Sequence, residues 1–331
     1  MSVQNDRKRA VKKLRLLAYS GKSDVGIFRS RIDSEFSTVF LPNNVECAEH
    51  RYGDVDCDVL SPEIYASSRV MLYVHGGSFV GGSRRAWRGF CSSLAAKTFS
   101  RVIVPEYRLA PAYPYPAAIE DIQTVFRTLF TEEQVACSLN SGDRAGIPEI
   151  IIAADGSGAA VVCAFLFNLR ERYRNCIRKV IFFSPWLDFS PESKIISSKK
   201  ISDEIISSEI LRRSVSEYTY SSNTSSPFVS PLAADESQFE SFPPVFIQMG
   251  GREILLDDAE NFRRKVVSAG GRCEIDVWPD MMFMFQMADE FLNEPHLALD
   301  RIGHVVTEIS SDGGVQIDNC PRLEHSIRAD A

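Results

Sequence analysis

The stretch of residues 149–165 restricts the fold of this chain more than any other part of its sequence. It opens with a β-branched apolar run at 150–152, continues through the small residues of 153–160, and passes into an apolar helical pattern at Val161. An apolar strand, a tight turn and a helix in this order are typical of an α/β domain. The chain can fill such a domain, because 331 residues with 44% hydrophobic content can bury a substantial core.

The tight turn has the spacing of a nucleophile elbow, in which a strained apex residue carries the nucleophile. The positions two before and two after the apex must be small, because strand and helix pass close together there. Ala154 and Gly158 meet this requirement around position 156, where the residue is Gly156. A register shifted by one would make Ser157 the nucleophile, but Asp155 would then fill the crowded position before it. A third interpretation is a plain glycine-containing turn.

Charge and composition exclude several function classes. The net charge of -7 argues against nucleic acid as the main partner. No apolar run is long enough for a transmembrane segment, and residues 1–22 lack the apolar core of a signal peptide. The eight cysteines form no C-x-x-C pair, which argues against zinc. We therefore expect a cytoplasmic protein with neither metal nor cofactor.

The N-terminal residues 5–20 have a helical pattern with one apolar face and several bases around the rest. Two interpretations are open for this helix. It packs on the domain with a solvated basic face, which we favour, or it lies on a membrane surface.

Alternating strand and helix patterns fill the rest of the chain and predict a doubly wound, mostly parallel sheet. A hairpin hinged at Gly53 is predicted from the runs 45–52 and 55–60, a helix at 117–129, and a last strand at 274–278. Five continuous apolar runs are typical of strands buried on both faces, and we predict them as neighbouring inner strands: 69–74, 101–105, 149–154, 179–183 and 244–249.

Paired glycines follow the first inner strand, in the sequence His75-Gly76-Gly77-Ser78. Such glycines let backbone N–H groups point at one place, which is what an oxyanion needs. We expect the N–H groups of Gly76, Gly77 and Ser157 to converge beside Gly156. A plain glycine turn is the alternative.

Together, three motifs resemble the hormone-sensitive-lipase-like family of α/β-hydrolases. The glycine turn is similar to that family's His-Gly-Gly-Gly, the run 107–117 to its Tyr-Arg-Leu-Ala-Pro motif, and the run 154–159 to its Gly-Asp-Ser-Ala-Gly-Gly elbow. The resemblance covers about residues 45–310. It implies an α/β-hydrolase fold: a mostly parallel eight-stranded sheet with helices on both faces and a helical cap.

The same resemblance implies a division of the chain. An N-terminal helical cap segment occupies 1–44, and the hydrolase domain occupies 45–310 with a second cap segment at 190–230. A loose tail follows at 311–331, because that stretch lacks an apolar period. The family's members often pair through the last strand, so a homodimer through residues 274–278 is possible.

The resemblance also assigns the catalytic positions, and two of the three are changed. The nucleophile position is Gly156 and the base position is Phe283, in a loop that reads Pro279-Asp-Met-Met-Phe-Met-Phe285. The acid position is Glu253, which can orient a histidine; a surface acid at a helix N-terminus is the alternative. No histidine lies between residues 76 and 295. No catalytic residue set is therefore expected to be intact.

Three functions remain open. The first is a pseudo-hydrolase that binds a small apolar ligand or a protein partner. The second is an active esterase or lipase with a rearranged site that uses Ser157. The third is an interaction protein with a vestigial pocket. The residues expected to line the pocket are His75, Met281, Met282, Phe283 and Phe285, since methionine and phenylalanine suit adaptable apolar recognition.

Overall fold

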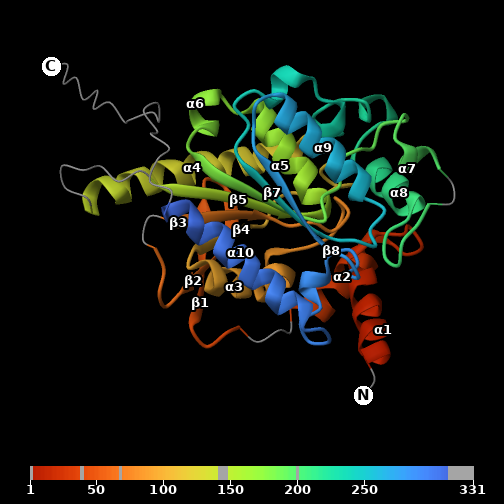
Figure 1. The fold of residues 1–331 in the computed structure, drawn as a ribbon, viewed down its shortest axis with the longest axis horizontal. Helices are drawn as coiled ribbons and strands as arrows, with labels where there is room; N and C mark the ends of the chain where they lie inside the picture. Colours follow the sequence, from red (N-terminus) through yellow and green to blue (C-terminus); the bar gives the residue numbers. More distant parts are fainter. Residues whose placement is uncertain (1–2, 38–40, 67–68, 141–147, 199–200, 312–331) are drawn as a thin grey trace.

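The computed structural model describes residues 3–37, 41–66, 69–140, 148–198 and 201–311. They form an eight-stranded sheet with helices on both faces (Figure 1). The tail predicted at 311–331 lies, except for its first residue, outside the described residues.

The sheet has the strand order β1-β2-β4-β3-β5-β6-β7-β8. The pairs β1–β2 and β2–β4 are antiparallel, and all the other pairs are parallel. The strands are β1 Val45–Tyr52, β2 Val55–Pro62, β3 Arg69–Val74, β4 Arg101–Pro105, β5 Glu149–Asp155, β6 Ile177–Phe183, β7 Val245–Gly250 and β8 Cys273–Trp278.

The five predicted inner strands are confirmed, and they lie side by side as β4, β3, β5, β6 and β7. Every residue of β3 and β7 is buried, which explains their uninterrupted apolar sequence. The predicted hairpin is β1–β2, with Gly53 at its turn in a left-handed conformation (φ 66°). Within the described residues β8 pairs only with β7, so it is an edge strand; the homodimer through it stays a prediction.

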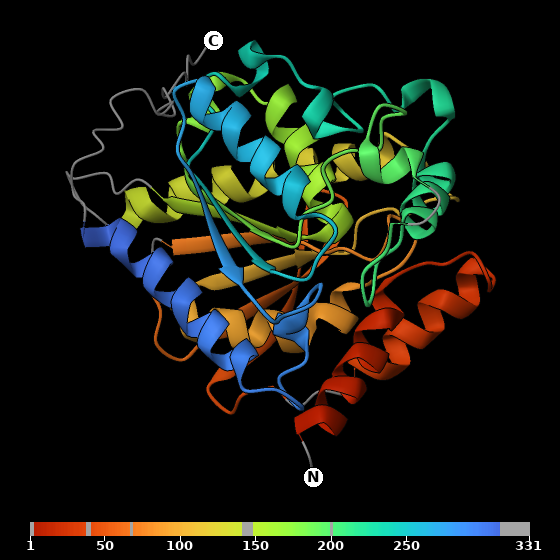
Figure 2. The same ribbon diagram turned by 45° about the vertical axis from the view of Figure 1, so that its right-hand side comes forward.

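Two layers of helices cover the sheet. Helices α3 and α10 lie against one face, and α4, α5 and α9 lie against the other (Figures 1 and 2). The helices are α1 Val3–Leu14, α2 Val25–Phe36, α3 Arg84–Thr98, α4 Ala117–Asn140, α5 Gly156–Asn168, α6 Glu171–Arg174, α7 Lys194–Ser197, α8 Ser208–Tyr218, α9 Leu256–Ser268 and α10 Glu294–Ser311. None of the helices in the described part of the chain is long and apolar enough to cross a membrane.

Helix α4 is longer than predicted: the predicted end at residue 129 is wrong, and the helix continues to Asn140. Phe130, Glu133 and Cys137 recur at helical spacing and are all buried. The carboxylate of Glu133 is paired with Arg101 of β4, so a buried acid extends the helix face that packs on the sheet.

The N-terminal helix α1 packs on the protein's own surface, as the favoured interpretation predicted. The Arg7 side chain donates to the carbonyl oxygen of Asp280 at 2.7 Å, and Arg15 donates to that of Glu204 at 2.8 Å. Glu204 belongs to the 190–230 segment, whose helices α7 and α8 lie at the same end of the molecule as α1 and α2 (Figure 2). The division into two cap segments stays an interpretation.

Candidate functional site

The strand-to-helix turn between β5 and α5 has its strained residue at Gly156. Its φ is 46°, in the left-handed region, whereas Ser157 has no positive φ. The position two after the apex is as crowded as an elbow requires, because a Cβ on Gly158 would lie 2.3 Å from the carbonyl oxygen of Val74. Steric packing against the end of β3 therefore makes position 156 the apex of the turn.

The side chain of Phe283 packs against this apex. A Cβ on Gly156 would lie 3.3 Å from Cζ of Phe283 and 3.8 Å from Nε1 of Trp186. The two rings are themselves in contact, with centroids 6.2 Å apart, and Phe283 is only 2% exposed. The residue predicted at the base position thus lies opposite the residue predicted at the nucleophile position, and its ring fills the gap between them.

Glu253 lies next to this contact as a buried carboxyl group. Its Oε1 accepts hydrogen bonds from the Gly250 N–H and from Ser184 Oγ at 2.8 Å. Ser184 Oγ in turn accepts from the Met284 N–H at 3.1 Å, which links the acid to the residue after Phe283. Glu253 is buried, so the alternative of a surface acid is wrong.

The other oxygen of Glu253, Oε2, is buried and has no hydrogen-bond partner within the described residues. Burial raises the pKa of this carboxyl group to about 8, because removal from water disfavours the charged form. An acid that would orient a histidine needs such a free oxygen, and here the neighbouring loop offers the phenyl ring of Phe283 instead of an imidazole.

The prediction that the Gly76 N–H is an oxyanion donor is wrong. Its N–H donates to Asp155 Oδ1 at 2.8 Å, and Tyr73 and Trp87 donate to the same oxygen at the same distance. The glycine turn packs directly on the end of β5, since a Cβ on Gly76 would lie 2.3 Å from Asp155 Oδ2. The carboxylate therefore takes the amide that the paired-glycine pattern assigned to an oxyanion.

Two of the predicted oxyanion donors keep N–H groups that the structure leaves available. The Gly77 N–H makes no hydrogen bond within the described residues, and its φ of 104° is one that glycine adopts readily. The Ser157 N–H is in the first turn of α5, where amides have no acceptor inside the helix.

The fallback nucleophile Ser157 has no histidine as a hydrogen-bonded base within the described residues. Its buried Oγ accepts a hydrogen bond from the Phe79 N–H at 3.0 Å, and none of the histidines in the described ranges hydrogen-bonds to it. The ring of His75 instead packs against Tyr107 and Trp87, with centroids 4.4 Å and 5.0 Å away. Burial lowers the pKa of His75 to about 4, so the imidazole is neutral at pH 7.

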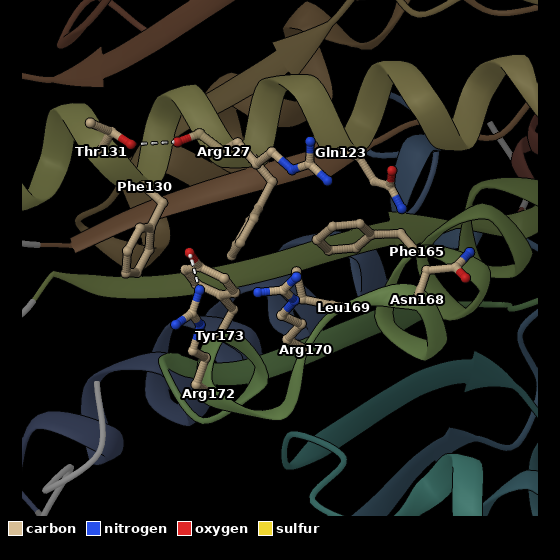
Figure 3. A pocket seen from close by; sticks show the side chains of 11 residues that line it. Gln123, Arg127, Phe130, Thr131, Phe165, Asn168, Leu169, Arg170, Arg172 and Tyr173 are labelled. Atoms are coloured by element: carbon tan, nitrogen blue, oxygen red, sulfur yellow. Dashed lines mark hydrogen bonds between the residues drawn. The ribbon is translucent and has the colours of Figure 1, made fainter. Parts of the chain in front are cut away.

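The methionine- and phenylalanine-rich loop fills space beside the elbow. Met281, Met282, Phe283 and Phe285 are each no more than 6% exposed. The predicted pocket residue His75 does not join them, because it is held by the two aromatic rings described above. A cavity of about 420 Å³ lies elsewhere, between α4, the end of α5 and α6 (Figure 3).

The described ranges contain no cluster of three or more histidine, cysteine, aspartate or glutamate side chains that could hold a metal ion. The sequence did not point to Ser184 or Trp186 as site residues. Both follow β6, in the sequence Phe183-Ser-Pro-Trp186, and a buried strand that runs into a proline turn is the signal that could have marked them.

Comparisons with known proteins agree with this fold. A family model described as the alpha/beta hydrolase fold matches residues 71–287. An esterase of Acinetobacter venetianus is 30% identical over 250 residues, which cover 75% of this chain and 77% of the relative. An acetyl-hydrolase of Streptomyces hygroscopicus is 28% identical over 245 residues, which cover 74% and 77%.

A solved structure of an esterase from the bacterial hormone-sensitive lipase family has a similar fold. It superposes with a TM-score of 0.80 and 26% identity, covering 93% of this chain and 99% of that one.

Proposed function

We propose that this chain, which belongs to the α/β-hydrolase fold family, is a pseudo-hydrolase that has the architecture of an esterase but does not hydrolyse esters. The contact between Gly156 and Phe283 carries the proposal. A Cβ on Gly156 would lie 3.3 Å from Cζ of Phe283. The side chain at the base position therefore takes the space that a nucleophile needs.

The chemistry of ester hydrolysis explains why this contact is decisive. The reaction needs a nucleophile, a base that accepts its proton and an acid that orients the base. Gly156 offers no oxygen, and Phe283 offers no basic nitrogen. Loss of either the nucleophile or the base costs on the order of a million-fold in turnover, and oxyanion donors alone leave roughly 10³ to 10⁴ over water.

In place of hydrolysis we propose a binding role, with a small apolar ligand or a protein as the partner. A ligand at the elbow would have to displace Phe283 and Met282, which are both buried. This filled site favours a vestigial elbow, with binding at another part of the molecule.

An esterase that uses Ser157 is the competing function, and the relatives named esterase and acetyl-hydrolase favour it. The hydrogen bond from the Phe79 N–H to Ser157 Oγ opposes it, because this oxygen is buried and faces no imidazole within the described residues. A serine without a base stays a weak nucleophile at neutral pH.

Hydrolysis of p-nitrophenyl esters, from acetate to decanoate, tests the proposal. We expect wild-type protein to release nitrophenol at the background rate. The double variant Gly156→Ser, Phe283→His should hydrolyse short esters, because the smaller imidazole removes the contact at Cζ and supplies the base. Its rate should stay about 100-fold below that of a well-aligned triad, because misplacement of reacting groups by ~1 Å costs that much.

The matched control is Gly156→Ala with Phe283→His, which has the same imidazole but no nucleophile, and it should stay at background. A wild-type protein that cleaves short esters and loses this activity on Ser157→Ala would overturn the pseudo-hydrolase proposal. Equal rates for the double variant and its control, with both folded, would contradict the assignment of positions 156 and 283.

A further inference from the structure

The cavity between α4, the end of α5 and α6 is separate from the elbow. It has a volume of about 420 Å³, within the usual range of small-molecule sites. Gly156 begins α5 and Asn168, which lines the cavity, ends it, so a helix rise of 1.5 Å per residue separates them by about 18 Å. A ligand here would not touch the elbow.

Aromatic rings form the wall of this cavity. Phe126 contacts Phe165 and Phe130, with centroids 5.1 Å and 6.0 Å apart, and Phe130 meets Tyr173 edge-on at 5.5 Å. The three phenylalanines are buried, so their positions are fixed by the core. The wall is therefore a rigid aromatic layer from α4 across to α6, and the half-buried ring of Tyr173 exposes more of its surface than the phenylalanines do.

Three arginines lie at the rim of the cavity. Figure 3 shows Arg170 and Arg172 on the side of Tyr173, and Arg127 across the cavity on α4. The Arg172 side chain donates to Tyr173 Oη at 3.3 Å, and its guanidinium carbon lies 4.8 Å from the ring centroid. All three arginines are exposed, and none of them forms an ion pair within the described residues.

The acids that neighbour these arginines in sequence are engaged elsewhere. Glu132 pairs with His50 at 3.3 Å, and Glu133 pairs with Arg101. Glu171 accepts a hydrogen bond from Ser241 Oγ at 2.7 Å. The serine hydroxyl does not cancel the charge of Glu171, so the rim carries three positive charges against that one negative charge, on a chain whose net charge is -7.

We propose that this cavity binds a small amphipathic organic anion, with an aromatic or aliphatic body against the phenylalanine wall and an acidic head group at the arginines. The planar guanidinium fork fits carboxylate, sulfonate and phosphate oxygens with paired hydrogen bonds. The apolar wall supplies affinity, and the arginines supply orientation and the preference for an anion.

Fluorescence titration with two matched probes tests the inference. The probes are 1-anilinonaphthalene-8-sulfonate and its neutral counterpart N-phenyl-1-naphthylamine, which has the same body without the sulfonate. We expect the full-length wild-type protein to bind the anion more tightly than the neutral probe. Raising the salt concentration from a dilute buffer to about 1 M should weaken binding of the anionic probe only, because salt screens the exposed charges.

Variants locate the site. A triple variant should bind the anionic probe about tenfold more weakly, since three exposed charge pairs together contribute roughly that much. It combines Arg127→Gln, Arg170→Gln and Arg172→Gln. The affinity of this triple variant for the neutral probe should be unchanged. Arg31→Gln, an exposed control on α2, should bind both probes as the wild type does. Asn168→Trp, which places a large side chain in the cavity, should weaken the binding of both probes.

Circular dichroism and thermal melting confirm that each variant is folded. Titrations with decanoate, decyl phosphate and decanol then identify the head group, and the alcohol should compete worst. Equal affinity for the anionic and neutral probes, or an unchanged anion affinity in the folded triple variant, would overturn the inference. Because the elbow is not involved, these results are independent of the ester assays.

Discussion

At the scale of single residues, the carboxyl group of Glu253 gives the protein a measurable pH dependence. Burial raises its pKa from the ordinary 4.5 to about 8, so the folded protein holds a proton that the unfolded chain releases. The stability linked to this proton is present below about pH 4.5 and is lost as the pH rises through about 8. We predict that Glu253→Gln, which is neutral throughout, removes this loss.

Chemical denaturation from pH 4.5 to 9 measures the effect as the difference in free energy of unfolding between variant and wild type. This difference should move in favour of the variant as the pH rises, by on the order of a few kcal/mol in all. Asp155 and Asp258 also have raised pKa values, of about 7, but they are present in both proteins and cancel. Parallel pH curves would contradict a buried, protonated Glu253.

The sequence motifs assigned Gly156 and Phe283 to catalytic positions, but they could not predict which residues surround these two positions. Ser184 joins Glu253 to the Phe283 loop by hydrogen bonds across 69 and 100 residues, and no local pattern encodes such a link. The error at Gly76 has the same origin. Paired glycines predict free amides, and only the folded structure shows that the Asp155 carboxylate takes one of them.

At the scale of elements, the close approach of α5 to β3 fixes the elbow. A Cβ on Gly158 would lie 2.3 Å from Val74 O and 2.6 Å from His75 O, and neither backbone can move without disturbing the sheet. We predict that Gly158→Ala lowers the free energy of unfolding by about 3 kcal/mol or more, at the upper end of overpacking effects. Urea denaturation measures this loss.

Gly270→Ala is the matched control for that substitution. A Cβ there meets nothing within 4 Å, although its φ is 82°, so only backbone strain of about 1–2 kcal/mol applies. Losses of equal size in the two variants would mean that α5 does not press on the end of β3 as described.

The same scale shows which elements a sequence can predict. Strands buried on both faces have continuous apolar runs, so β3, β5 and β7 were placed within about one residue of their observed ends. Helix α4 extends beyond the predicted end at residue 129, and Glu133, an acid that no apolar pattern includes, lies on its buried face. That acid is buried only because Arg101, on a different element, pairs with it.

At the scale of the whole molecule, α1 is fastened to the loop that follows β8. Lys13 lies buried in α1, and its Nζ is 2.9 Å from the Glu290 carboxylate and 5.2 Å from the ring centroid of Phe36. The guanidinium of Arg9 lies 4.5 Å from the ring centroid of Phe291. The N-terminal helix therefore packs on the chain segment that follows β8, the segment to which Phe283 also belongs.

Charge reversal at two adjacent lysines tests this fastening. Lys13→Glu puts an unpaired carboxylate at a buried position beside the half-exposed Glu290, so we predict a loss of about 2 kcal/mol or more in the free energy of unfolding, as for a charge buried without a partner. Lys12→Glu changes the same charge at an exposed position of α1 and should stay within about 0.5 kcal/mol of wild type. Denaturation at neutral pH compares the two. Similar small effects would mean that α1 is not docked on the loop, and would return the membrane-surface interpretation of its basic, amphipathic sequence to consideration.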